Sequence, residues 1–253
     1  MKMAVDIGGT YLRYFLNRTY KVKLEDIDVQ SFLQDLIHKH RIEAIAISFA
    51  GQVCCGRILS APNIKAPFQP QNLGIPYIIE NDLNCAALAE ARYFGAAFLV
   101  ALYSGTGLGS GIIEDGKLCR GSENLAGEIG HIPYKKSPFR CGCGKDNCIE
   151  LYASGSGLKK WGRYKGCATS LEESCVKEEY LRAITHAAAT MLTLCNPKLL
   201  VLGGGVIKSN PFVVEYVKEH IRNYAPPFSL LPIEFSRLQE PSLEGAKILL
   251  EKL

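Results

Sequence analysis

The chain has no apolar run long enough to cross a bilayer, and its N-terminus shows no export signal. The start, MKMAVDIGGTYL, has neither a long apolar stretch nor a cleavage-site pattern. Its basic residues are scattered, so the net charge of +4 does not indicate a nucleic-acid-binding face. We therefore expect a cytoplasmic protein that binds neither a membrane nor nucleic acid.

Without an export signal, the ten cysteines are expected to be reduced thiols and metal ligands instead of a disulfide framework. Hydrophobic residues make up 47% and charged residues 21% of the 253 positions, which is ordinary for a soluble enzyme. This length accommodates one large domain or two modest lobes.

Apolar runs alternate with glycine-rich turns along the chain, and this pattern predicts an α/β protein of two lobes. Strands are expected at 4–7, 11–16, 75–79 and 98–103, and buried strands at 42–49 and 199–202. Helices are expected at 82–94, about 181–195 and 243–253. The segment 51–72 is rich in turn residues, so we expect it to be mostly loop.

Two glycine loops each follow an apolar strand: Gly8-Gly9-Thr10 within VDIGGT, and segment 105–111 within YSGTGLGSG. Glycine lets backbone N–H groups converge on a phosphate without a side chain in the way. The first loop alone is better explained as a hairpin turn, but two such loops with the hydroxyls of Thr10 and Thr106 shift the balance toward phosphate binding. The second loop leads into a strand instead of a helix, which excludes a dinucleotide fingerprint.

Two carboxylates follow or end predicted strands. Asp6 precedes the first glycine loop, where it could hold Mg²⁺ against phosphates. Asp82 lies where a strand meets a helix, so it is either a helix cap or the base that accepts a proton from an attacking hydroxyl. Because phosphoryl transfer depends mainly on positioning, an ionised carboxylate at a helix N-terminus is adequate for this role.

The most specific signal is a set of metal ligands, His131 followed by Cys141, Cys143 and Cys148. Three thiolates and one imidazole make a tetrahedral zinc site, and the short spacing is typical of a zinc knuckle. Four protein ligands leave no open position for water. The sequence therefore predicts structural zinc and argues against a zinc hydrolase.

Together these motifs resemble the ROK family of bacterial sugar kinases and sugar-responsive repressors, within the actin and hexokinase superfamily. The matching segments are VDIGGT (5–10), the loop 61–63, ENDLNCAALAE (80–90), SGTGLGSG (104–111), AGEIGH (126–131), CGCGKDNCIE (141–150), LGGG (202–205) and LEGA (243–246). They occur in family order over nearly the whole chain. The zinc segment with GEIGH is highly specific, whereas single glycine loops are not.

The resemblance implies two RNase-H-like (actin-like ATPase) lobes around a central cleft, with the last helix returning to the first lobe. The small N-terminal lobe is expected to comprise residues 1–82 and 239–253, with the first phosphate loop. The larger lobe, residues 83–238, is expected to hold the second phosphate loop, the zinc motif and the adenosine-binding segment. A homodimer is also expected.

The resemblance further implies an ATP-dependent kinase that uses Mg²⁺ and a hexose, with Asp82 as catalytic base. Residues expected to bind the sugar are Gly51, Asn63, Asn81, Asp82, Glu128, His131 and Glu150. Residues expected to bind ATP are Asp6 (through Mg²⁺), Gly8, Gly9, Thr10, Gly105, Thr106, Gly107, Gly204 and Gly205. One ring nitrogen of His131 would bind zinc while the other faces the sugar.

Asn147 occupies a position where family knuckles usually have glycine. Asparagine tolerates positive φ better than most residues, so we expect zinc binding to survive. The expected sugar is glucose, because GEIGH with Glu150 is typical of glucose-type pockets. N-acetylmannosamine, fructose, mannose and allose stay open, as does polyphosphate as donor.

The main alternative is a catalytically inactive, sugar-binding regulator of the same fold. Family repressors carry an N-terminal DNA-binding domain, whereas here the first phosphate loop begins within ten residues of Met1. Asp6 and the two glycine loops also favour turnover, so we expect a kinase.

Overall fold

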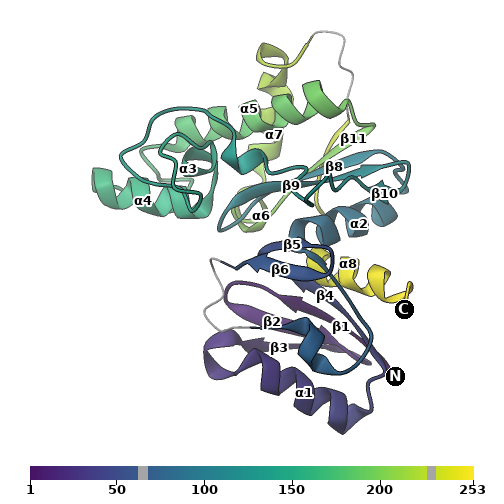
Figure 1. Ribbon diagram of the computed structural model, residues 1–253. Coiled ribbons are helices and arrows are strands. Elements are labelled where there is room, and N and C mark those ends of the chain that lie inside the picture. Colours follow the sequence, from purple (N-terminus) through teal and green to yellow (C-terminus); the bar gives the residue numbers. More distant parts are fainter. Residues whose placement is uncertain (62–67, 227–231) are drawn as a thin grey trace. The chain divides into compact units, whose positions relative to one another are not determined.

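A computed structural model describes residues 1–61, 68–226 and 232–253 (Figure 1). The predicted sugar contact Asn63 lies outside these residues. The chain forms two compact units. Unit 1 contains Met1–Arg92, Arg120–Ala126 and Leu238–Leu253, and unit 2 contains Tyr93–Cys119 and Gly127–Arg237.

Unit 1 is built on a five-stranded sheet of order β3-β2-β1-β4-β7. Its strands are β1 (Lys2–Ile7), β2 (Tyr11–Phe15), β3 (Thr19–Lys23), β4 (Ala44–Phe49) and β7 (Tyr77–Asn81). The first three pair antiparallel, whereas β4 and β7 run parallel to β1. Strands β1, β4 and β7 confirm strands that the sequence predicts, although β7 begins two residues later than the expected 75–79. β4 is buried throughout, as predicted, whereas β7 is buried only in part.

Helices cover both faces of this sheet, as the alternation of β1 side chains requires. Met3, Val5 and Ile7 belong to one core with α1 (Val29–His40). Ala4 points to the opposite face and packs with Leu243 of α8 (Pro241–Leu250). The third helix of unit 1, α2 (Asp82–Phe94), follows β7 directly, as predicted.

Unit 2 repeats this strand order in a second five-stranded sheet, β10-β9-β8-β11-β12. Its strands are β8 (Leu99–Ser104), β9 (Leu108–Glu114), β10 (Lys117–Leu118), β11 (Leu199–Gly203) and β12 (Ile233–Phe235). Its helices are α3 (Glu150–Ala153), α4 (Gly155–Lys165), α5 (Lys177–Cys195), α6 (Gly205–Ser209) and α7 (Phe212–His220). Short 3-10 helices lie at Leu24–Asp26, Pro70–Leu73, Ile129–His131 and Ile221–Asn223.

One difference from the predicted elements lies in segment 51–72. It contains a hairpin of β5 (Gln52–Cys54) and β6 (Arg57–Ser60). The turn between them has positive φ at Cys55 (51°) and Gly56 (73°), and cysteine gives no sequence signal for that conformation.

One cysteine pair also departs from the expectation of reduced thiols. Cys167 and Cys175 form a disulfide, with Cα atoms 6.1 Å apart. Helix α4 ends at Gly166, whose left-handed backbone reverses the chain and carries Cys167 toward Cys175. Within the described part of the chain, no helix has both the length and the apolar character needed to span a membrane.

Candidate active site

The parallel strands of unit 1 deliver three predicted site segments to one edge of the sheet. The register pairs Ile7 with Phe49, and Phe49 with Asn81. The three strands therefore end at the same edge of the sheet. Gly8 follows β1, Gly51 lies just beyond β4, and Asp82 follows β7. Adjacent strands lie about 4.8 Å apart, so Ile7 and Asn81 are separated by about 10 Å. The first glycine turn and the proposed base thus share one sheet edge.

Asp6 is buried between its two register partners, Arg13 on β2 and Ser48 on β4. Ser48 Oγ donates a hydrogen bond of 2.8 Å to one carboxylate oxygen, and Arg13 Nη1 donates one of 3.2 Å to the other. Burial raises the pKa of Asp6 above its ordinary value, although the Ser48 hydrogen bond and the Arg13 charge oppose this shift. Both oxygens are therefore already engaged within the protein.

Arg13, which the sequence analysis did not single out, also lies at the first glycine turn. Its Nη1 lies 3.9 Å from where a Cβ on Gly8 would sit, so the guanidinium borders the first glycine turn. Its Nε lies 2.8 Å from Glu240 Oε2, an ion pair without good hydrogen-bond alignment. The signal that could have identified Arg13 is the antiparallel pairing of β1 with β2, which places residue 13 directly opposite Asp6. An arginine here can bind an anionic group at the turn.

We predict that Arg13→Gln lowers the free energy of unfolding by about 2 kcal/mol at neutral pH. The variant leaves the buried Asp6 carboxylate without its cation, and such losses reach about 3–5 kcal/mol for fully buried pairs. The lower figure reflects the 20% exposure of the Arg13 side chain. Urea denaturation measures the change.

The matched control is Arg57→Gln, which alters an exposed arginine on β6 and should shift stability by less than about 0.5 kcal/mol. In the double variant Asp6→Asn/Arg13→Gln, part of the loss should be recovered because no unpaired carboxylate remains. If Arg13→Gln is as stable as Arg57→Gln, the ion pair contributes nothing to the fold.

The strand end at β7 is fixed by hydrogen bonds around Asp82. Asn81 caps α2, because its Oδ1 accepts from Leu83 N at 2.9 Å and Asn84 N at 3.2 Å. Asn81 Nδ2 donates to Gly51 O at 3.1 Å, which ties the two predicted sugar-binding segments together. Asp82, the first residue of α2, accepts from Leu83 N at 3.0 Å. The helix N-terminus favours an ionised carboxylate at this position.

In unit 2, the second glycine loop lies between β8 and β9. Its carbonyls are engaged by the start of α4: Gly105 O accepts from Gly155 N at 2.8 Å and Thr106 O accepts from Ser156 N at 3.0 Å. A Cβ on Gly105 would lie 3.8 Å from Gly205 N, so the loop and the Gly204-Gly205 segment after β11 are adjacent.

Gly204 has φ of 91°, and a Cβ there would lie 2.4 Å from Ser104 O. Only glycine combines this backbone conformation with so close an approach to the end of β8. The parallel pairing of β8 with β11 explains why both glycine segments leave the sheet at the same edge.

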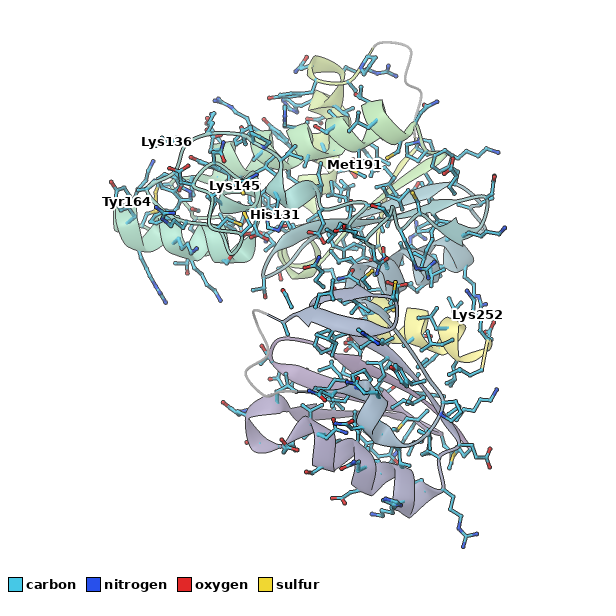
Figure 2. All side chains as sticks on the ribbon, in the orientation of Figure 1. His131, Lys136, Lys145, Tyr164, Met191 and Lys252 are labelled. Atoms are coloured by element: carbon cyan, nitrogen blue, oxygen red, sulfur yellow. A yellow bond between two sulfur atoms is a disulfide. The ribbon has the colours of Figure 1, made fainter. Side chains whose placement is uncertain are left out.

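The four predicted zinc ligands come together in unit 2 (His131 is labelled in Figure 2). Their ligand atoms all lie within 4.8 Å of one another. Cys141 Sγ is 3.4 Å from His131 Nδ1, and Cys143 Sγ is 3.4 Å from Cys148 Sγ. A tetrahedron with Zn–S bonds of about 2.3 Å has edges of about 3.8 Å, so this donor set fits a zinc ion.

Two of the three thiols at this cluster, Cys141 and Cys148, favour the neutral form when no cation is beside them. At Cys143, hydrogen bonds to the sulfur outweigh partial burial and lower the pKa. Burial raises the pKa of Cys141, and it raises the pKa of Cys148 to about 11. Glu150 Oε1, 3.3 Å from Cys141 Sγ, adds negative charge. A divalent cation would reverse this preference and hold the thiols as thiolates.

Short antiparallel contacts form the base of the knuckle. Tyr134 N donates to Asn147 O at 2.8 Å, and Ser137 N donates to Asp146 O at 2.7 Å. Asn147 is not among the residues with positive φ, whereas Gly144 has φ of 90°. Asn147 therefore does not draw on the tolerance of asparagine for positive φ, and the left-handed position in this segment is Gly144.

Three predicted sugar-binding side chains gather beside the knuckle. His131 turns Nδ1 toward Cys141 and Nε2 toward Glu128, whose Oε2 lies 3.7 Å away. Glu150 Oε2 accepts from Leu108 N at 3.0 Å, next to the second glycine loop. Burial raises the pKa of Glu128, and the His131 ring opposes this shift while Glu150 adds to it. The cluster offers several acceptors to a polyhydroxyl ligand.

The sequence model of the ROK family matches residues 2–252. A glucokinase from Streptomyces coelicolor is 38% identical over 226 residues, which cover 73% of this chain and 71% of that protein. A xylose repressor from Caldicellulosiruptor bescii is 29% identical over 73% of this chain and 56% of the repressor. The crystal structure of a ROK family glucokinase from Streptomyces griseus, in complex with glucose and AMPPNP, matches with a TM-score of 0.79. It is 26% identical and covers 100% of this chain and 99% of that chain.

Proposed function

This chain belongs to the ROK family, and we propose that it is an ATP-dependent sugar kinase that phosphorylates a hexose hydroxyl, with glucose as the leading acceptor. The observation that carries the proposal is the shared edge of the unit 1 sheet. The parallel register brings a glycine turn with Arg13 and an ionisable carboxylate, Asp82, to the same level. The likeness to glucokinases supports the choice of reaction.

In the proposed mechanism, Asp82 orients the acceptor hydroxyl and takes its proton as the oxygen attacks the γ-phosphorus. Backbone N–H groups at Gly9 and Thr10 receive the phosphates. The expected donor at Gly8 is already engaged, because Gly8 N donates to Tyr11 O at 3.0 Å within the turn. Arg13, which borders this turn, adds a positive charge that stabilises the transferring group. Mg²⁺, when bound with ATP, would neutralise phosphate charge. Because both oxygens of Asp6 are engaged by Ser48 and Arg13, Asp6 would reach the ion best through water.

On the sugar side, Glu128, His131 and Glu150 bind hydroxyls, together with Asn81 and the Gly51 segment. His131, Cys141, Cys143 and Cys148 would hold zinc, which fills its coordination shell with protein ligands and acts structurally. A metal at Nδ1 would fix the tautomer of His131, and Nε2 would then carry the proton that is donated to Glu128 or to a sugar oxygen.

The proposal assigns different tasks to the two units. Unit 1 carries the first phosphate turn and the base, and unit 2 carries the second phosphate loop, the adenosine segment Gly204-Gly205 and the knuckle. We further propose that each unit is RNase-H-like and that they are the two lobes of the family fold. The repeated strand order, three antiparallel strands followed by two parallel ones, supports this assignment. The expected domain limits, 1–82 with 239–253 and 83–238, and the homodimer stay predictions.

A second candidate is a sugar-responsive regulator without turnover, favoured by the likeness to the xylose repressor. A coupled assay of ADP release over a panel of glucose, mannose, fructose, allose and N-acetylmannosamine separates the two. Release of ADP that requires one sugar supports the kinase. Sugar binding by calorimetry without any ADP release, with ATP or polyphosphate as donor, would support the regulator and refute the kinase.

A further inference from the structure

Two adjacent thiols occupy the β5–β6 hairpin of unit 1, away from the predicted zinc ligands. Cys55 is exposed and Cys54 is half-buried. Their sulfur atoms lie 3.5 Å apart. No role in the proposed function uses either thiol, so the pair is a separate chemical feature.

The turn places unusual demands on Cys55. Its φ is 51°, and Gly56 follows with φ of 73°, a pair of positive values that favours asparagine and glycine in a two-residue hairpin. A cysteine here is not explained by the turn geometry. The conformation does present its sulfur to solvent and next to the sulfur of Cys54.

The thiols also line a cavity of about 390 Å³. Arg120 lies in the same lining, with its side chain 44% exposed. Arg120 Nε donates to Glu80 at 2.8 Å. This cavity offers room for a small thiol-bearing molecule, and the remaining guanidinium N–H groups suit a carboxylate on that molecule.

We propose that Cys54 and Cys55 are a site of reversible thiol–disulfide exchange, at which a low-molecular-weight disulfide oxidises the pair to a Cys54–Cys55 disulfide. The Cys55 thiolate attacks one sulfur of RSSR, forms a mixed disulfide and releases RS⁻. Cys54 gives its proton to solvent and attacks the Cys55 sulfur, which expels the second RS⁻. The pair loses two protons and two electrons, and RSSR becomes two RSH.

The order of attack follows from the contact between the two thiols. The hydrogen bond to Cys55 raises the pKa of Cys54, so Cys54 keeps its proton longer. Cys55 is also the more exposed of the two and the easier to reach. Cys55 is therefore the attacking residue and Cys54 the resolving one.

The closed ring should be readily reduced. Neighbouring Cα atoms are about 3.8 Å apart across a trans peptide, whereas ordinary disulfides span about 4.4–6.8 Å. The ring is therefore strained, and strained, exposed disulfides are the labile ones. A reversible modification, not a permanent cross-link, is the expected outcome.

Oxidation also has a consequence that rests on the proposed function. Closing the ring forces the turn to change, and the hairpin adjoins two hydrogen bonds to neighbouring segments, one of them between the predicted sugar contacts Gly51 and Asn81. Gly51 O accepts from Asn81 Nδ2, and Val53 O accepts from Asn124 Nδ2 at 2.7 Å. We expect oxidation to raise KM for the hexose at least about threefold, with little change in kcat.

The test uses the full-length, metal-loaded protein and glutathione disulfide. After incubation, free thiols are alkylated and the protein is digested with trypsin. The peptide Ile42–Arg57 contains Cys54 and Cys55 and no other cysteine. The ring makes this peptide lighter by two hydrogen atoms and unreactive to the alkylating agent. The half-buried Cys195, alone in the peptide Ala183–Lys198, is the internal control.

We expect the pair to react at least about tenfold faster than Cys195. In the Cys54→Ser variant the reaction should stop at the mixed disulfide on Cys55. In the oxidised wild-type protein, dithiothreitol should restore both free thiols. The proposal would be overturned if Cys54 and Cys55 were still free, and so alkylated, at a time when glutathione disulfide had already modified Cys195. It would also be overturned if the wild-type protein formed a mixed disulfide that never converted to the Cys54–Cys55 disulfide. Because mass detects the reaction, a wild type without kinase activity would refute the proposed function and leave this test intact.

The consequence for activity needs a matched variant. Cys54→Ser/Cys55→Ser should keep wild-type kinetics in reducing buffer and become insensitive to glutathione disulfide. Equal rises in KM for the wild type and the double variant would place the effect at other thiols and overturn the link between the hairpin and sugar binding.

Discussion

Asp82→Asn is expected to lower kcat by about 10³-fold, equivalent to about 4 kcal/mol of transition-state stabilisation. Asparagine has nearly the same shape and can still accept from Leu83 N, as Asp82 does at 3.0 Å. It cannot accept the proton of the attacking hydroxyl. Sugar binding should therefore persist while turnover is lost, which a coupled ADP assay and calorimetry measure separately.

The matched control is Asp35→Asn, which neutralises an exposed carboxylate on α1 in the same unit. It should leave both kcat and sugar affinity within twofold or so of wild type. Turnover of Asp82→Asn near the wild-type rate would show that no base acts at this position. Loss of sugar binding as well would make Asp82 a binding residue instead.

Cys143→Ser is expected to reduce zinc affinity by at least about 100-fold and to destabilise unit 2. Cys143 is exposed, whereas Cys141 and Cys148 are buried, so its replacement removes one ligand with little loss of packing. Without the metal, the buried Cys141 thiol faces the carboxylate of Glu150. Elemental analysis gives the metal content, and thermal denaturation with and without chelator gives the stability.

Cys195→Ser serves as the control, because it removes a half-buried thiol of the same unit outside the cluster. This variant should retain one zinc per chain. Wild-type protein purified without zinc, or a melting temperature that a chelator leaves unchanged, would contradict the metal site. A fall in stability of Cys143→Ser without metal loss would point to packing alone.

The elements with strong apolar patterns were predictable from the sequence. The β1–β2 hairpin, the passage from β7 into α2 and the long helix α5 all lie where periodicity predicts them. The four candidate zinc ligands do lie together, because their spacing along the chain constrains them locally. Zinc itself, and the roles of the proposed active-site residues, stay predictions.

Features that depend on contacts between distant segments were not predictable. The role of Arg13 depends on a strand register and on Glu240, far along the chain. Helix α4 was missed because its glycines weaken the helical pattern, although Ser154 caps it by accepting from Gly157 N at 3.1 Å. The Cys167–Cys175 disulfide depends on the chain reversal at Gly166, which spacing alone does not reveal.

The late position of α8 in the chain affects how unit 1 is made on the ribosome. This helix packs against β1 and β4, and Leu243 and Ala246 cover Ala4 on one face of the sheet. During synthesis that face stays bare until about 240 residues have been added, roughly 10–50 s at ordinary translation rates. The nascent sheet thus exposes this apolar face throughout translation, and an apolar surface left open in this way is prone to non-specific association.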